Sequence, residues 1–354
     1  MKCCAECFSS EYVRTIILSN STQLGDCDFC KSKNTKLYEP RELVFLFLGI
    51  LELYSPDSTK NSVAEPIESR IIKDFPNKIF NISDLTVIKN LLLQITSDEI
   101  ETLSTIFQSN VILECLQNPN TKNQADVLES VWNTFVNEIK NENRFHIKNA
   151  IDLKKLEKLL KRHIREISKG RIFYRARISD KGGFNKDNMS NPPNHLAKAG
   201  RANPQGISYL YIASDIETTF FETRAILFDY VSIAEFRLKE TIRVINLRET
   251  ELYDPIQLAE QDDLKDFIIH YPFISRLEKE ISKPNRRADN ELDYLPTQYL
   301  SEFIKSLGFD GVEYRSSVNP NGYNLAIFNP NKFEIIKTYV HEINHVDFGH
   351  SKVN

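Results

Sequence analysis

The stretch Gly200–Ala225 reads GRANPQGISYLYIASDIETTFFETRA and combines three kinds of local structure. Its first part is rich in Gly, Asn and Pro, which is typical of a loop. The run SYLYIA favours a short strand, because aromatic and β-branched residues are enriched in strands. Asp215 then opens an apolar segment in the manner of a helix-capping residue. Tyr211 lies within this strand, and Arg201 and Glu222 lie before and after it, so the stretch predicts either a site built around the strand or an ordinary strand and helix.

The sequence around this stretch, from residue 170 onward, alternates short β-rich runs with turns. Further strands are expected in RIFYRARI (171–178), VSIAEFRL (231–238), IRVINL (242–247), DGVEYRSS (310–317), NLAIFN (324–329) and FEIIKTYV (333–340). Helices are expected between them at about 216–228, 256–283 and 296–307. The pattern predicts an α+β domain over residues 170–340, followed by a C-terminal tail over residues 341–354.

Residues 41–169 have a different texture, with apolar residues repeating at helical spacing and no glycine between Gly49 and Gly170. Helices are expected in RELVFLFLGILELY (41–54), LTVIKNLLLQI (85–95), DVLESVWNTFVNEIKN (126–141) and DLKKLEKLLKRHIREI (152–167). This region predicts an α-helical middle domain.

The first 40 residues contain five of the six cysteines. Four of them form two CxxC pairs with the spacing of a four-thiolate zinc site: Cys4, Cys7, Cys27 and Cys30. Cys3 is a neighbour that could replace Cys4. Short strands are expected in RTIILSN (14–20) and TKLYEP (35–40), beside the two pairs. Residues 1–40 therefore predict a small zinc-ribbon-like knuckle with a structural zinc ion, because such closed sites have no open position for chemistry.

The overall composition excludes several classes of protein. The formal net charge is −4 and no acidic or basic tail is present, so neither nucleic acid nor a membrane surface is indicated as a partner. The longest apolar run, 43–54, is too short to span a bilayer, which takes about 20 residues. The N-terminus has no apolar signal-peptide region, and the CxxC pairs suit a reducing compartment, so a cytoplasmic location is expected.

Residues 170–340 resemble the RES domain, a family named for an arginine, a glutamate and a serine. The resemblance rests on separated motifs in the family's order: FYRARI, GRANPQG, YLYIAS, FFE, YRSS and GYNLAIF. It implies a mixed β core similar to that of diphtheria-toxin-like ADP-ribosyltransferases and an activity that consumes NAD. Some members are toxins neutralised by a DNA-binding antitoxin, so an antitoxin or regulatory protein is an expected partner. The zinc knuckle and helical region resemble, more weakly, extensions that precede some RES domains.

The resemblance also implies the site residues. Matched by motif, the catalytic residues are Arg175, Arg201, Tyr211, Glu222 and Ser316. Ser317 is the alternative to Ser316 within the serine doublet. Residues expected to bind NAD are Arg175, Arg177, Arg201 and Tyr211. The insert over residues 179–199, between the first two motifs, is expected to be a flap.

The chemistry of NAD cleavage agrees with these residue types. Cleavage of the bond between nicotinamide and ribose passes through an oxocarbenium-like ribose, as in glycoside hydrolysis. Arginine suits the pyrophosphate through charged, two-pronged contacts, and a tyrosine ring suits the nicotinamide by stacking. One glutamate can hold a ribose hydroxyl and stabilise the cation. The acceptor of the ADP-ribose, whether water (glycohydrolase), phosphate (phosphorylase) or a protein (ADP-ribosyltransferase), stays open.

Two other functions are open on sequence alone. A catalytically inert RES-like module could bind a nucleotide or a partner. HEINH (His341–His345) matches the HExxH motif of zinc peptidases, which needs a helix to bring both histidines to one face. Residues 41–169 lack the R-x4–6-H spacing of related helical ribonucleases, so they are interpreted as a regulatory or scaffold domain.

Overall fold

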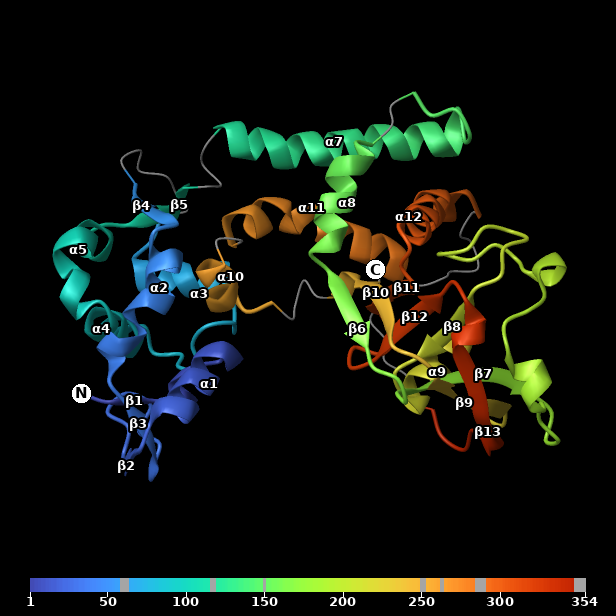
Figure 1. Ribbon diagram of the computed structural model, residues 1–354, viewed down its shortest axis with the longest axis horizontal. Coiled ribbons are helices and arrows are strands. Elements are labelled where there is room, and N and C mark those ends of the chain that lie inside the picture. Colours follow the sequence, from blue (N-terminus) through green and yellow to red (C-terminus); the bar gives the residue numbers. More distant parts are fainter. Residues whose placement is uncertain are drawn as a thin grey trace, which may run out of the picture. The chain divides into compact units, whose positions relative to one another are not determined.

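The computed structural model of the 354-residue chain describes residues 1–57, 64–114, 119–148, 151–248, 253–261, 264–283 and 291–346. The chain divides into two units. The first comprises Met1–Val127 with Leu252–Pro272, and the second comprises Leu128–Glu251 with Phe273–Asn354. Figure 1 shows a mainly helical first unit and a second unit built on a large sheet. The domain boundaries predicted at residues 40, 169 and 340 remain predictions.

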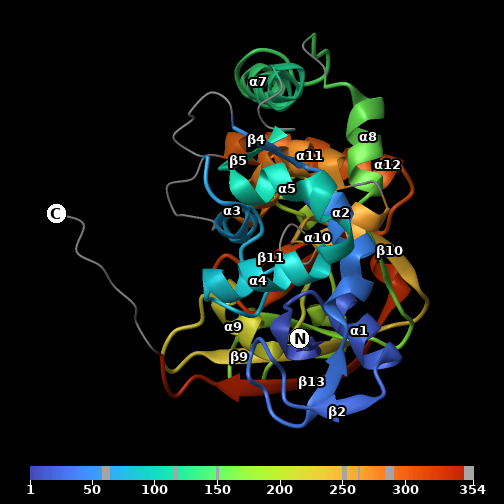
Figure 2. The ribbon, with the colours of Figure 1, turned by 90° about the vertical axis from the view of Figure 1, so that its left-hand side faces the viewer.

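The first unit contains a small antiparallel sheet, a two-stranded ribbon and several helices (Figure 2). The sheet has the order β1-β3-β2, with β1 at Cys3–Cys4, β2 at Gln23–Gly25 and β3 at Thr35–Tyr38. The ribbon pairs β4 (Tyr54–Pro56) with β5 (Val111–Leu113). The helices are α1 (Glu11–Asn20), α2 (Val44–Leu51), α3 (Ile67–Asp74), α4 (Leu85–Ile95), α5 (Ile100–Gln108) and α10 (Pro255–Glu260).

One hydrophobic core joins the cysteine-containing sheet to these helices. Phe8 follows β1, Phe47 lies in α2 and Phe80 precedes α4, and their ring centroids are 5.9–6.0 Å apart. All three side chains are buried. The knuckle therefore shares its apolar interior with the helical region, which supplies the core that a few short strands cannot build alone.

The strand expected in RTIILSN (14–20) is wrong, because this run lies in α1. Ser10 begins the helix, and its hydroxyl accepts a hydrogen bond from the Val13 backbone N–H at 3.1 Å. Val13 and Ile17 then fall on one helical face, and both are fully buried. Capping and helical periodicity outweigh the β-branched composition of the run. The strand expected in TKLYEP is confirmed as β3.

The second unit is built on an eight-stranded sheet with the order β13-β9-β7-β8-β12-β11-β10-β6. The strands are β6 (Ile164–Ile167), β7 (Ile172–Ser179), β8 (Leu210–Ala213), β9 (Tyr230–Leu238), β10 (Ile242–Asn246), β11 (Gly311–Arg315), β12 (Tyr323–Ile327) and β13 (Phe333–Glu342). Strands β10 and β11 run parallel, whereas the other neighbours are antiparallel. The sheet is therefore mixed, and the α+β class is confirmed.

Both faces of the sheet are covered. Strand β12 is buried at all five positions, as expected for a central strand between two apolar layers. One layer packs Tyr314 and Ala326 against side chains of the four helices α7 (Pro119–Asn141), α8 (Leu153–Lys161), α11 (Leu264–Ser282) and α12 (Leu295–Ser306). The opposite layer contains Phe173, Phe236 and Leu325. Within the described part of the chain, no helix has the length and hydropathy needed to cross a membrane.

Strand β6 corrects a second expectation. The helix predicted over residues 152–167 ends at Lys161, and Ile164–Ile167 forms an edge strand instead. This edge strand pairs antiparallel with Ile242–Ile245 of β10. The local sequence is compatible with helix, and pairing with a distant strand decides the outcome.

The junction between β7 and β8 shapes the site. These strands pair at one position only, Tyr174 with Ala213, whereas β7 pairs with β9 along its whole length. Helix α9 (Ile216–Thr223) follows β8 directly. Asp215 caps it by accepting a hydrogen bond from the Thr218 N–H at 2.8 Å, and Arg224 ends it in the left-handed conformation, with a φ of 54°.

Candidate active site and cysteine cluster

A cavity of about 270 Å³ lies where β7 and β8 diverge beside α9. The residues that line it are Tyr174, Arg175, Ala176, Tyr211, Ile212, Ala213, Thr219, Glu222, Thr223, Tyr314 and Asn324. Three of the predicted site residues, Arg175, Tyr211 and Glu222, are therefore brought together in one cavity wall. They come from β7, β8 and the last turn of α9.

Glu222 accepts two hydrogen bonds on the same carboxylate oxygen. Its Oε1 accepts from Ser316 Oγ at 2.6 Å and from Asn324 Nδ2 at 2.7 Å. Both donors are buried, whereas Glu222 itself is exposed. The two bonds fix the carboxylate at the mouth of the cavity without neutralising its charge.

Ser316 is oriented by the loop that follows β11. Its hydroxyl oxygen accepts a hydrogen bond from the Asn319 N–H at 3.1 Å, so its own proton is directed to Glu222. Asn319 Nδ2 in turn donates to Thr218 Oγ1 in α9 at 2.8 Å. Ser317 is exposed, and Ser316 is the member of the doublet that meets the glutamate.

Gly322 closes the same loop against α9. A Cβ atom at this position would lie 1.8 Å from Thr218 Oγ1, closer than any real contact, so the loop can approach the helix only with glycine here. The loop and the first turn of α9 are therefore packed as one piece.

Arg175 brings a half-buried positive charge to the cavity. Its Nη1 donates to the backbone carbonyl of Tyr211 at 3.2 Å. Its buried Nε has no hydrogen-bond partner among the described residues. Burial, with a smaller contribution from the charge of Arg177, lowers the pKa of Arg175 to about 10. A half-buried guanidinium without a carboxylate partner favours an anionic ligand.

Tyr211 uses its hydroxyl to hold the preceding loop. The hydroxyl donates to Asn203 Oδ1 at 2.7 Å and accepts from the Ala202 N–H at 3.2 Å. Burial raises the pKa of Tyr211 to about 12, so the phenol stays protonated at physiological pH. Because the loop occupies the hydroxyl, the ring of Tyr211 is the part of this cavity residue that suits stacking on a ligand.

The two remaining predicted arginines lie outside the cavity wall. Arg201 stacks over the ring of Tyr294, 5.1 Å from its centroid, and its Nη1 donates to the Glu280 carbonyl at 3.5 Å. Arg177 is exposed, lies 4.5 Å from the ring centroid of Phe184 and donates to the Asn188 carbonyl. The structure thus groups Arg175, Tyr211, Glu222 and Ser316, and it places Arg177 and Arg201 elsewhere.

The sequence interpretation missed two residues of the cavity, Tyr314 and Asn324. They are direct partners in the pairing of β11 with β12, and Asn324 is in turn paired with Ala213 of β8. They therefore project from the same face of the sheet. A signal was present, because Asn324 is the only amide in an otherwise apolar buried strand.

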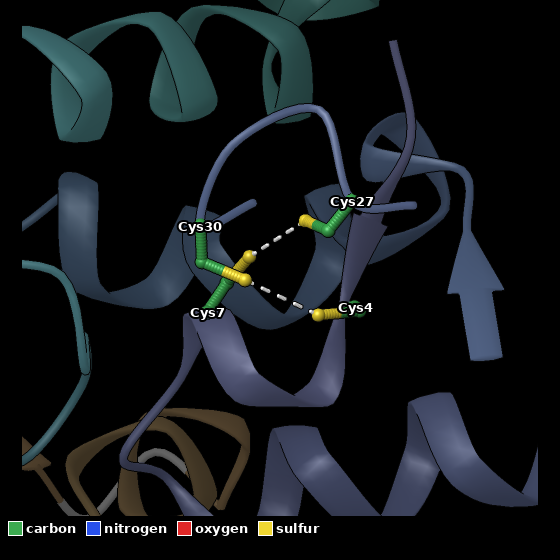
Figure 3. A group of neighbouring side chains, drawn as sticks. All are labelled: Cys4, Cys7, Cys27 and Cys30. Carbon is green, nitrogen blue, oxygen red and sulfur yellow. Dashed lines mark hydrogen bonds between the residues drawn. The ribbon is translucent and has the colours of Figure 1, made fainter. Parts of the chain in front are cut away.

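The four predicted zinc ligands meet in the first unit. The sulfur atoms of Cys4, Cys7, Cys27 and Cys30 all lie within 4.8 Å of one another. Figure 3 shows the sulfur atoms of Cys4 and Cys30, and of Cys7 and Cys27, facing each other in pairs 3.4 Å apart. Four thiolates around one zinc ion at about 2.3 Å would be separated by about 3.8 Å, so the cluster fits a tetrahedral metal.

Hydrogen bonds from Cys4 and Cys7 lower the pKa of Cys27, whereas hydrogen bonds with Cys27 and Cys4, together with burial, raise the pKa of Cys7.

The HExxH motif does not form a zinc-peptidase site. His341 and Glu342 belong to strand β13, so the required helix is absent in this described part of the chain. The His341 ring packs against Phe220 and Tyr339, with centroids 5.7 and 5.3 Å away. Gly349 and His350, beyond the motif, lie outside the described residues.

Comparisons with known proteins bear on the second unit. Among solved structures, the chain is similar to a chain of the M.tuberculosis MbcT-MbcA toxin-antitoxin complex. The identity is 13%, the match covers 52% of this chain and 91% of that chain, and the TM-score is 0.31, a likeness too distant to inform the site. None of the curated proteins matches the sequence. The model of the RES domain matches residues 172–348, half of the chain, and this chain therefore belongs to the RES domain family.

Proposed function

We propose that the second unit cleaves the bond between nicotinamide and ribose in NAD. The observation that carries this proposal is the Glu222 carboxylate, held on one oxygen by Ser316 and Asn324 in a cavity that also contains Arg175 and Tyr211. An oriented carboxylate is the group that an oxocarbenium-like transition state requires. A cavity of about 270 Å³ lies near the lower end for ligand sites, so we place only the nicotinamide mononucleotide half of NAD within it.

The cavity residues have separate roles in this proposal. Glu222 binds a ribose hydroxyl and stabilises the developing positive charge with its fixed negative charge. Tyr211 stacks its ring on the nicotinamide, and Arg175 holds a phosphate oxygen. Arg201 and Arg177 remain assigned to the pyrophosphate by the family resemblance. Nicotinamide leaves with the electron pair of the broken bond, and water, phosphate or a protein then bonds to the ribose carbon.

Purified full-length protein incubated with NAD tests the proposal. The expected result is the release of one free nicotinamide for each NAD consumed, which chromatography measures. Mass spectra of the second product, with and without added phosphate, distinguish hydrolysis from phosphorolysis, and labelled protein bands reveal ADP-ribosyl transfer. Binding of NAD without nicotinamide release would favour the inert nucleotide-binding module.

On the resemblance to toxins, we also propose that the activity depletes cellular NAD, as a toxin or a defence effector, and that an antitoxin or regulatory protein controls it. Induced expression of the wild type should lower the NAD content and arrest growth, whereas Glu222→Gln should do neither. Equal growth arrest by both proteins would contradict NAD depletion as the cause.

For the first unit we propose a structural zinc ion held by the four cysteines. The closed set of four sulfur ligands leaves no position for a substrate, and the five described cysteines are all unpaired thiols. Reduced thiols suit the cytoplasm, where we place the protein. We assign the helical region that shares the core of the cluster a regulatory or scaffold role.

A further inference from the structure

Tyr314 lines the cavity, but neither the family motifs nor the proposed function assigns it a role. It lies on β11, its side chain lines the cavity, and the residue is 8% exposed. Among the described residues, no hydrogen bond to its hydroxyl is found. Because Tyr314 lines the cavity and its hydroxyl has no partner among the described residues, this hydroxyl is suited to bind a ligand there.

The surroundings of Tyr314 keep it a hydrogen-bond donor. Burial raises the pKa of Tyr314 well above 10, interactions with Tyr211 and with the Glu222 carboxylate raise it further, and Arg201 acts in the opposite direction. The phenol is therefore protonated throughout the physiological pH range. It can donate a hydrogen bond, and it does not act as a general base.

The carboxylate of Glu222 supplies the matching acceptor. Ser316 and Asn324 both bind Oε1, and among the described residues no hydrogen bond to Oε2 is found. Asn324 is the direct strand partner of Tyr314, so the phenol lies beside the residue that orients the glutamate. Glu222 and Tyr314 both line this cavity, so a ligand bound there has one acceptor oxygen and one donor hydroxyl available to it.

A substrate hydroxyl satisfies both groups at once. It can donate its proton to a carboxylate oxygen while its own oxygen accepts from a phenol. In glycoside cleavage, hydrogen bonds to the hydroxyl next to the reacting carbon strengthen as the oxocarbenium ion forms. In NAD this hydroxyl is the 2′-hydroxyl of the nicotinamide ribose.

We propose that Tyr314 is a further catalytic residue. Its hydroxyl donates a hydrogen bond to the 2′-hydroxyl oxygen of the nicotinamide ribose, while Glu222 Oε2 accepts a hydrogen bond from that 2′-hydroxyl. The inference rests on the proposed function. Tyr314 keeps its proton throughout, because the bond to nicotinamide breaks with its electron pair on the leaving nitrogen. The two contacts fix the ribose and share its charge in the transition state.

The test compares Tyr314→Phe with a matched control, Tyr209→Phe. Tyr209 is also buried, at 2% exposed, and its hydroxyl likewise has no partner among the described residues, but it does not line the cavity. Tyr314→Phe should lower kcat/KM for NAD by about 10-fold, the value of one hydrogen bond strengthened in the transition state. Tyr209→Phe should remain within about 2-fold of the wild type.

The second arm uses the NAD analogue that lacks the 2′-hydroxyl. On this analogue Tyr314→Phe and wild type should have the same kcat/KM, because the acceptor of the hydrogen bond is gone. The ratio of rates on the two substrates is measured on one preparation, so it does not depend on how much of the variant is folded. An equal loss on both substrates, or no loss on NAD, overturns this inference and leaves the proposed function intact. A wild type that releases no nicotinamide overturns both.

Discussion

The cysteine cluster and the cavity at β7 and β8 both bring reactive side chains together, but they differ in how many of their polar groups have no partner within the protein. In the cluster the four sulfur atoms face one another, and they could fill every ligand position of a tetrahedral metal. In the cavity, Glu222 is held on one oxygen only, and Arg175 has a buried Nε without a partner among the described residues. The closed set of sulfur atoms suits the cysteine cluster to a stabilising role. The hydrogen-bonding groups left without a protein partner suit the cavity to binding a ligand.

Removing one cluster ligand should have the largest effect. We expect Cys27→Ala to lose the zinc ion and, with it, the cooperative thermal unfolding of the first unit, since metal binding of this kind contributes on the order of 10 kcal/mol to folding. Nicotinamide release should stay within roughly 3-fold, because the cavity lies in the other unit.

Metal analysis and calorimetry measure this prediction. A wild type purified without added zinc that contains no zinc, or that contains these cysteines oxidised in pairs, would contradict the closed-site interpretation. A variant that keeps its zinc and its unfolding transition but loses NAD cleavage would reverse the roles of the two regions.

Removing the charge of the open site comes next. Glu222→Gln keeps the shape of the side chain and can keep its hydrogen bonds, but it loses the negative charge. We expect kcat for nicotinamide release to fall about 100-fold or more, with a much smaller change in NAD affinity. Glu217→Gln, on the same helix but not in the cavity wall, is the control and should be nearly silent.

Steady-state kinetics with both variants decides the assignment of the glutamate. Wild-type turnover by Glu222→Gln would show that the carboxylate held by Ser316 is not catalytic. An equal loss in both variants would indicate damage to α9 rather than loss of a catalytic group.

Substitution of Arg175 should have opposite effects on NAD binding and on stability. Arg175→Met removes a half-buried charge whose buried Nε has no partner among the described residues, so we expect the unfolding free energy of the second unit to rise by about 1 kcal/mol. Apparent affinity for NAD should weaken by about 10-fold, because the anion contact is lost. Thermal unfolding and the KM for NAD are the two measurements, and a loss of stability together with an unchanged KM would mean that Arg175 is structural.

The smallest effect belongs to the helix cap in the first unit. Ser10→Ala removes the N-cap of α1 and a 2.7 Å hydrogen bond to Asp254, so the first unit should lose about 1 kcal/mol of stability. NAD cleavage should not change. Ser10→Thr, which retains a capping oxygen, should recover most of the loss, and failure to do so would assign the effect to packing rather than to the cap.

The two regions also differ in how far the sequence predicts them. The zinc ligands are two local pairs, and their spacing alone predicts the cluster that the structure contains. The cavity combines residues more than one hundred positions apart, and the family motifs supplied three of them, Arg175, Tyr211 and Glu222. Tyr314 and Asn324 were not assigned to the site, because they become neighbours only through the pairing of β11 with β12. The register of that pairing cannot be predicted from the local composition of either strand.

Elsewhere, packing decided against local patterns. The side chains of Arg177 and Arg201 turn toward Phe184 and Tyr294, which motif positions do not reveal. The run RTIILSN became helix through its cap, and Ile164–Ile167 became strand through pairing with β10. The seven strands expected after residue 170 are confirmed, because alternating β-rich runs between turns are a strong local signal.

The hydrogen bonds from Ser316 and Asn324 to Glu222 also determine when the site can form during translation. Strand β12 lies between β8 and β11 in the sheet, so a growing chain that has not yet reached Asn324 has neither a completed sheet nor a fixed Glu222 carboxylate. Because domains fold as units while the chain emerges, the proposed NAD-cleaving site is assembled only after Asn324 has been translated. A product truncated before Asn324 therefore lacks the hydrogen bond that fixes Glu222.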